Sequence, residues 1–395
     1  MKTFIFLALV VVCITITLTG WGNAQTAGPG IITINQGSCP SLSGMNQFPS
    51  NSHCFSGTIS CSNVHSDVAD IGFTFGAQGT SGTNGTIVLF SHGDGTTLDF
   101  DNTVLSNYNQ AQFGTVEVIW QPASPGGLAP WEQSASGTGT VTTIIKHAAC
   151  RPATLLNWIF SPGNINDGHI YGSGGKCAEG VSAGSAAIAY SMAQYNVNYL
   201  DAVEFLSGPP LSDISKGCGG TDQANVCSES FCHSAPLGMT PEGSWTDAFA
   251  YSQQEGAIDR WTNVAPHTCG NSNGSGPNYL DMSIVDNESD STFHYPATAV
   301  SIWVCASPGN NSICNGSNPP ANNSAAEADY FADQIAGFGS ARALKLFRVD
   351  GCTPTNEDVG NGFVPAFYNG TTCPKGNTVI AHDMATECQA PPKHH

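Results

Sequence analysis

The chain has 395 residues, of which 40% are hydrophobic, 45 are glycine and only 10% are charged. This apolar share is large enough for a buried core and excludes wholesale disorder. Asp and Glu number 30 against 11 Lys and Arg, a formal net charge of -19, which repels phosphate backbones and excludes nucleic acid as a partner.

The N-terminus has the pattern of a secretory signal peptide. Lys2 precedes an apolar run from Phe4 to Leu18, and Gly22 and Ala24 are the small residues that a cleavage site after Ala24 requires. We therefore expect residues 1–24 to be removed and the mature protein to be secreted, into the extracellular space or a periplasm. An uncleaved membrane anchor is the alternative. No later stretch of the sequence is long and apolar enough to span a membrane.

The cysteines agree with export. The sequence has 15 Cys, and loss of Cys13 with the signal peptide leaves an even number. In an oxidising compartment these residues should pair as disulfides, although the sequence does not determine the pairing. Three pairs would each close a Gly- or Asn-rich loop: Cys54/Cys61, Cys305/Cys314 and Cys352/Cys373. Cys227, Cys232 and His233 could instead be metal ligands, but no second ligand pair has zinc-like spacing, so we expect no metal and no other cofactor.

Strand and helix patterns alternate along most of the chain. Residues 25–80 are expected to be a loop-rich segment and residues 81–395 one domain. Apolar or β-branched runs predict five strands: Thr86–Phe90, Thr115–Trp120, Ala202–Leu206, Ala299–Cys305 and Ala343–Val349. Helical spacing is found in three segments: Ile144–Phe160, Ser185–Tyr195 and Ala325–Phe338. This alternation predicts an α/β fold with a mainly parallel sheet flanked by helices. Residues 208–297 interrupt it, and we interpret them as a disulfide-rich cap insertion.

The sharpest motif is a G-x-S-x-G sequence, Gly180-Val181-Ser182-Ala183-Gly184. A nucleophilic serine on a sharp strand-to-helix turn needs small residues on both sides, because bulky neighbours would clash in that turn. The helix that follows places positive potential at its N-terminus, which favours an oxyanion. A Gly/Ser turn without chemistry is the alternative interpretation.

A second motif follows the strand Thr86–Phe90 and reads Ser91-His92-Gly93-Asp94-Gly95. A turn at this place commonly supplies one backbone N–H of an oxyanion hole, and the residue after the nucleophile supplies the other. We expect Gly93 and Ala183 to be these two donors. A simple glycine turn is the alternative.

With these motifs the chain resembles the α/β-hydrolase superfamily, in particular secreted bacterial esterases and lipases. The resemblance covers Thr86–Pro210 and extends, with less agreement, over Tyr295–Cys388. It implies Ser182 as the nucleophile above a three-layer sheet. It also implies a catalytic acid after the strand Ala299–Cys305 and a histidine after the strand Ala343–Val349.

The sequence departs from this pattern at both of those positions. Asn310 and Asn311 stand where the carboxylate is expected, and residues 350–358 contain no histidine. Asp350 is the acid that we select, with Asp213 as the alternative. His382 is the expected base, although its surroundings favour a helix over a catalytic loop. Three further histidines could approach the site from loops: His92, His169 and His233.

Two functions follow from these residues. The first is a secreted serine hydrolase that cleaves carboxylic esters through an acyl-serine intermediate, since a serine becomes nucleophilic only with a base within hydrogen-bond reach. Its substrate would be a small-molecule or polymeric ester. The second is a catalytically degenerate hydrolase fold that acts as an extracellular binding or structural module. The oligomeric state stays open.

Overall fold

The computed structural model describes residues 30–42, 47–62, 67–74, 84–91, 98–100, 102–121, 148–161, 174–181, 183–206, 208–209, 212, 223–226, 232–234, 245–248, 284, 294–305, 324–337, 341–349 and 376–388.

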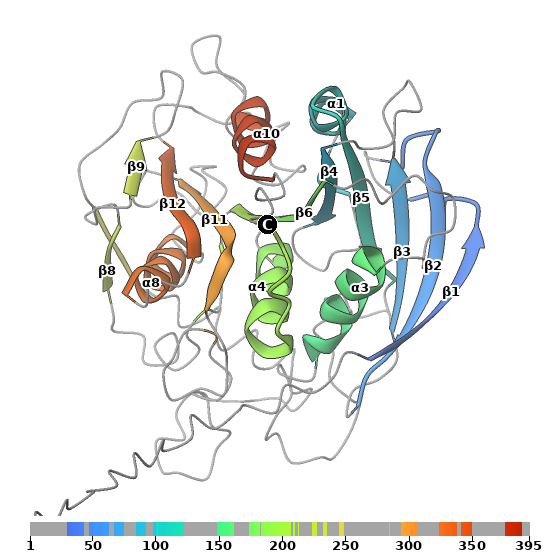
Figure 1. Ribbon diagram of the computed structural model, residues 1–395, viewed down its shortest axis with the longest axis horizontal. Helices are drawn as coiled ribbons and strands as arrows, with labels where there is room; N and C mark the ends of the chain where they lie inside the picture. Colours follow the sequence, from blue (N-terminus) through green and yellow to red (C-terminus); the bar gives the residue numbers. More distant parts are fainter. Residues whose placement is uncertain are drawn as a thin grey trace, which may run out of the picture.

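One large sheet organises these residues (Figure 1). Its ten strands are β1 (Ile31–Gly37), β2 (His53–Ser60), β3 (Asp67–Thr74), β4 (Gly85–Phe90), β5 (Phe113–Trp120), β6 (Gly175–Val181), β7 (Ala202–Leu206), β9 (Cys232–Ser234), β11 (Tyr295–Cys305) and β12 (Ala341–Val349). Their order across the sheet is β1-β2-β3-β5-β4-β6-β7-β11-β12-β9. Pairing is antiparallel from β1 to β5 and parallel from β5 to β9. The five strands expected from the sequence therefore lie in one mainly parallel sheet, which confirms that prediction.

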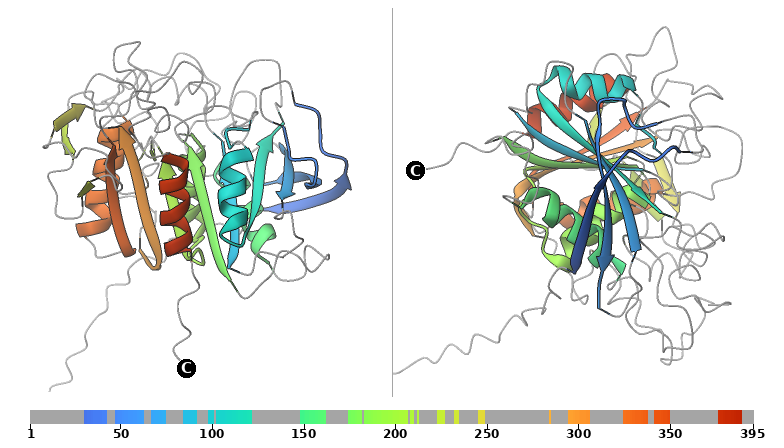
Figure 2. Two further views of the ribbon diagram at one scale, coloured as in Figure 1. Left: turned by 90° about the horizontal axis from the view of Figure 1, so that it is seen from above. Right: turned by 90° about the vertical axis from the view of Figure 1, so that its right-hand side faces the viewer.

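Helices cover both faces of the sheet (Figure 2). On one face lie α3 (Cys150–Phe160), α4 (Ala183–Tyr195) and α8 (Ser324–Gly337), which share a core with alternate strand residues such as Val88 and Phe205. On the other face lie α1 (Asn102–Gln110) and α10 (Gly376–Glu387), which form a second core with Leu89 and Leu206. The three-layer arrangement explains the sequence of the central strands. Every residue of β4, β5 and β7 is buried, because a parallel sheet covered on both faces has no solvent side.

The N-terminal segment differs from the loop-rich stretch that we expected. Residues 31–37, 53–60 and 67–74 are strands that extend the main sheet at its antiparallel edge. Most of the predicted cap, residues 208–297, lies outside the described residues. Within it the structure describes β9 and a separate two-stranded sheet of β8 (Gln223–Val226) and β10 (Trp245–Ala248).

The disulfides correct one of the predicted pairs. Cys54 bonds with Cys39, and Cys61 bonds with Cys150, so the pairing of Cys54 with Cys61 is wrong. The physical reason is β2, which keeps the chain extended between these two residues. Seven extended residues span about 23 Å, whereas bridged cysteines have Cα atoms less than about 7 Å apart. The other two predicted pairs include cysteines outside the described residues.

A third disulfide joins Cys177, in β6, to Cys388, directly after α10. Together, the three disulfides agree with an oxidising compartment. Among the helices that the structure describes, none has the length and apolarity needed to cross a membrane.

Candidate active site

The G-x-S-x-G sequence lies where a strand turns directly into a helix. β6 ends at Val181 and α4 begins at Ala183, so Ser182 is the single residue between them; Ser182 itself lies outside the described residues. β6 is a central strand, with β4 and β7 as its parallel neighbours. The flanking elements are thus the strand and the helix that the motif predicts.

Backbone atoms pack so closely around both glycines of the motif that neither position has room for a side chain. A Cβ atom on Gly180 would lie 2.4 Å from the carbonyl carbon of Gly184 and 2.5 Å from the amide nitrogen of Ser185. A Cβ atom on Gly184 would lie 2.2 Å from the carbonyl oxygen of Phe90 and 2.8 Å from that of Ser91. Glycine is therefore required at both positions by close backbone approach. Through these contacts the first turn of α4 packs directly against the ends of β6 and β4.

The predicted oxyanion turn starts at this contact. β4 runs parallel to β6 with Phe90 opposite Gly180, and the chain continues from Ser91 into residues 92–97, which lie outside the described residues and include Gly93. The Ser91 hydroxyl oxygen accepts a hydrogen bond of 3.1 Å from the backbone N–H of Asp99. That bond ties together the two ends of the segment that carries Gly93.

The N-terminus of α4 is less buried than the rest of the helix. Ala183 is partly exposed, whereas every later residue of α4 is buried. The first backbone N–H groups of a helix have no partner within the helix and carry the positive end of its dipole. A backbone N–H at this position, next to Ser182, is what the predicted oxyanion hole requires.

The candidate acids follow strands on one side of β6. Val181, Leu206, Trp303 and Phe347 stand in register across β6, β7, β11 and β12. Val349 is the last residue of β12 and directly precedes Asp350 in the chain, and β12 lies three strand spacings or about 14 Å from β6 in the sheet. An acid at that distance acts on the serine only through a histidine between them, which is the role of the acid in a triad. Asp350 and Asp213 themselves lie outside the described residues, as do Asn310 and Asn311.

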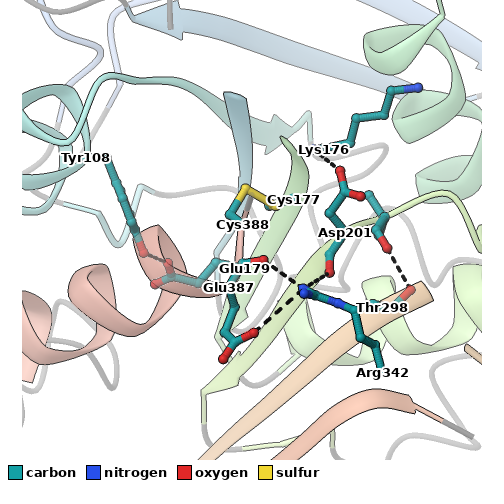
Figure 3. Close-up of a disulfide and its surroundings, with 10 residues drawn as sticks. Tyr108, Lys176, Cys177, Glu179, Asp201, Thr298, Arg342, Glu387 and Cys388 are labelled. Atoms are coloured by element: carbon teal, nitrogen blue, oxygen red, sulfur yellow. Dashed lines mark hydrogen bonds and ion pairs between the residues drawn. A yellow bond between two sulfur atoms is a disulfide. The ribbon is translucent and has the colours of Figure 1, made fainter. Parts of the chain in front are cut away.

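Helix α10, which carries His382, ends at a disulfide beside β6 (Figure 3). Its C-terminal end is anchored by the disulfide between Cys388 and Cys177, near the start of β6. One turn and a half earlier, the Asp383 carboxylate accepts a 2.7 Å hydrogen bond from the hydroxyl of Ser301, in the middle of β11. The N-terminal end of α10 therefore lies toward the edge where the parallel strands end.

His382 consequently lies on a helix beside the sheet and not on a loop beyond the strand ends. The six residues from Cys388 back to His382 rise by about 9 Å, whereas β6 advances by about 13 Å from Cys177 to Val181. The side chain of His382 lies outside the described part of the structure. Its proposed role as base requires it to reach past the last residue of β6.

Of the three further histidines that the sequence offers as bases, His233 lies in the described part of the structure. His233 lies in β9, in register with Phe347 of β12, which is four strand spacings or about 19 Å from β6. A general base needs a hydrogen bond to the nucleophile, so His233 is not brought to Ser182. His92 directly follows Ser91, whose backbone touches Gly184. His92 and His169 lie outside the described residues, as does Cys227 of the metal alternative.

Three ionisable residues of the sheet were not expected from the sequence. Glu117, Glu179 and Glu204 are each at most 1% exposed, in β5, β6 and β7. Tyr108 of α1 donates a hydrogen bond to Glu179, three residues before Ser182. A glutamate in the middle of an apolar strand, as in the TVEVIW and AVEFL runs, was the available signal.

Comparisons with known proteins return a general likeness to esterases. No family model and no curated protein sequence matches the chain. Among solved structures, an esterase from Rhizomucor miehei is 13% identical, with a TM-score of 0.46 over 87% of this chain and 83% of that chain. Brefeldin A esterase, described as a bacterial homologue of human hormone-sensitive lipase, is 12% identical, with a TM-score of 0.44 over 89% and 80%. Acetyl xylan esterase 1 from a Thermoanaerobacterium species is 11% identical, with a TM-score of 0.39 over 85% and 87%. Because these TM-scores are below 0.5, we argue the function from the site alone.

Proposed function

We propose that the protein is a secreted serine hydrolase that cleaves carboxylic esters through an acyl-serine intermediate on Ser182. The observation that carries this proposal is the pair of glycines at the turn from β6 to α4. Neither Gly180 nor Gly184 has room for a Cβ atom, and that packing is what a nucleophile elbow requires. A chance Gly/Ser turn has no reason to need both glycines.

The chemistry follows from the elements that meet at this turn. The Ser182 hydroxyl attacks the ester carbonyl carbon while a histidine takes its proton, and the carbonyl oxygen becomes an oxyanion. Backbone N–H groups of Ala183 and Gly93 stabilise that charge, one from the helix N-terminus and one from the loop after β4. The alcohol then leaves with the proton from the histidine, and water releases the acid by the same steps.

His382 is the proposed base and Asp350 the proposed acid. Their support is chain order, because serine, acid and histidine follow one another in that sequence in α/β-hydrolases. His92 is the rival base, favoured by its place directly after Ser91, next to the first turn of α4.

The second candidate is a degenerate hydrolase fold that serves as an extracellular binding or structural module. The observation that favours it is the absence of the expected groups from the sequence. Asn310 and Asn311 replace the acid after β11, and residues 350–358 contain no histidine.

Labelling with a fluorophosphonate probe separates the two candidates, because the probe reacts with activated serines. We expect the folded protein to be labelled and Ser182→Ala to lose the label. Ser191→Ala is the matched control: its hydroxyl is buried in α4 and donates only to the Ala187 carbonyl, so labelling should persist. Absence of labelling in the folded unvaried protein, together with no hydrolysis of a short p-nitrophenyl ester, would favour the module.

The same assay identifies the base. His382→Ala should lower the labelling rate by at least about 10³-fold, since loss of a triad member removes most of the activation. Normal labelling of His382→Ala with loss in His92→Ala would move the base to the loop after β4 and leave the hydrolase proposal intact.

A further inference from the structure

Three buried glutamates form a row across the centre of the sheet. Leu89 of β4 stands in register with Glu117 of β5 on one side and with Glu179 of β6 on the other. Glu179 in turn stands opposite Glu204 of β7. Residues in register on parallel strands point to the same face, and this face is the one covered by α1 and α10. We call Glu117, Glu179 and Glu204 the carboxyl row.

The carboxyl row has almost no hydrogen-bond partners. Among the residues that the structure describes, neither carboxyl oxygen of Glu117 or of Glu204 has a hydrogen-bond partner, and Glu179 has one only on the oxygen that Tyr108 contacts. All three side chains are at most 1% exposed. A bare carboxylate in such a place is very costly, whereas a protonated carboxyl group is tolerated.

The charged groups at the end of the row do not neutralise it. The Lys345 ammonium group of β12 donates to Asp383 at 2.7 Å and to Glu387 at 2.6 Å, both on α10. Arg342 of β12 also pairs with Glu387, at 3.6 Å. The two carboxylates of α10 thus hold the cations of β12. Asp383 adds negative charge beside Glu204, because its partner Ser301 stands opposite Glu204 in the sheet.

These surroundings raise the pKa of all three glutamates. Burial raises the pKa of Glu179 to about 8, against a lowering contribution from the Tyr108 hydrogen bond. Burial also holds the pKa of Glu204 well above its usual range, with Asp383 and Glu179 adding to the effect against a lowering contribution from Lys345. Burial alone raises the pKa of Glu117. At neutral pH Glu179 is therefore mostly protonated in the folded protein, and burial favours the protonated form of Glu117 and Glu204 in the same direction.

We propose that the carboxyl row is a proton-dependent lock that keeps α1 and α10 packed on the sheet. While the row keeps its protons, Tyr108 from α1 and Ile380 and Met384 from α10 cover neutral groups. When the protons leave, Glu179 and Glu204 become like charges on adjacent strands, about 4.8 Å apart and without water. The protein is thus built for acidic surroundings and loosens at this face as the pH rises. The lock does not depend on the proposed esterase activity.

The direction of the pH effect follows from proton counting. Above about pH 4.5 the unfolded chain has released these protons, whereas the folded protein retains them. Stability is therefore greatest below that pH and is lost as the pH rises toward about 8, where Glu179 ionises in the fold. The opposite dependence would follow if the glutamates were ionised and paired.

Thermal unfolding between pH 5 and pH 8 tests the lock, on the protein with its disulfides intact. We expect the Tm to fall by roughly 2 °C per pH unit for each retained proton. Glu204→Gln and Glu179→Gln keep the shape without the ionisable group, and the amide oxygen can still accept from Tyr108. Each variant should flatten the pH dependence and unfold at a higher temperature than the unvaried protein at pH 8.

Glu387→Gln is the matched control, because it removes a carboxylate of the same interface that pairs with Lys345. Its Tm should be lowered at both pH 5 and pH 8. Hydrogen exchange, corrected for its intrinsic pH dependence, should show α10 and α1 opening first at pH 8, with α4 still protected. A pH-independent Tm in the unvaried protein would overturn the proposal, and so would glutamine variants that are destabilised equally at both pH values.

Discussion

Replacement of Gly184 by alanine tests the packing on which the candidate site depends. The new Cβ atom would lie 2.2 Å from the carbonyl oxygen and 2.7 Å from the carbonyl carbon of Phe90. These are backbone atoms, so no side-chain rotation relieves the contact. The start of α4 and the end of β4 must separate by about 1 Å to reach an ordinary contact distance.

The expected cost has two opposing parts. Overpacking a well-filled site costs about 1–3 kcal/mol, and the rigid backbone neighbours place Gly184→Ala at the upper end. Alanine is a better helix former than glycine, by about 1 kcal/mol at most. The net loss of stability should be about 2 kcal/mol. Activity should suffer more, because a displacement of about 1 Å at a reacting group costs about 100-fold in rate.

Two measurements check this prediction: the Tm and the rate of fluorophosphonate labelling. Gly37→Ala is the matched control, because a Cβ atom on Gly37 meets nothing within 4 Å. It should leave both measurements unchanged. If Gly184→Ala folds with an unchanged Tm and is labelled at the unvaried rate, the turn is not built as we argue, and the main support for a nucleophile elbow is lost.

Two further predictions concern the covalent structure. The double variant Cys177→Ser/Cys388→Ser should lose up to about 5 kcal/mol of stability in denaturant titrations, because the bond closes a loop with a sequence separation of 211; an unchanged midpoint would mean that α10 is held by its packing alone. Intact-mass measurement with and without reduction should find a mature chain that begins near Gln25 and has no free thiol, and retention of residues 1–24 would contradict secretion.

The sequence predicts the centre of this fold better than its edges. β4, β7 and the end of β11 are runs of apolar residues, and burial on both faces produces that pattern. β6 has no such run, because its sequence GKCAEGV combines small residues with a lysine and a glutamate. β6 is a strand because it pairs with β4 on one side and with β7 on the other. The N-terminal strands were missed for a different reason: β2 alternates buried and exposed positions and includes Ser and Gly, so a local pattern resembles a loop.

For the site, the sequence locates the turn but not the groups that must meet there. The spacing of Gly180 and Gly184 is local information, although the contacts that require Gly184 are with Phe90 and Ser91, in a distant segment of the chain. A catalytic acid and base come from distant segments, and their meeting depends on loops whose path no local pattern determines. The carboxyl row is non-local in the same way: a glutamate within an apolar run is a local signal, but only strand register brings Glu117, Glu179 and Glu204 into one row.

The lock and the proposed mechanism place opposite demands on pH. A histidine base accepts a proton only when it is neutral, so hydrolysis should increase through about pH 6.5. The carboxyl row instead favours acidic solution, and β6 carries both Glu179 and the turn at Ser182. In a pH–activity profile, protonation of the histidine would then cause the loss of activity at low pH. Ionisation of the carboxyl row would cause the loss of activity at high pH. Glu204→Gln should therefore extend activity to higher pH and leave the acid limb in place. A variant that shifts both limbs together would mean that Glu204 acts on the base itself and not on the packing of the helices.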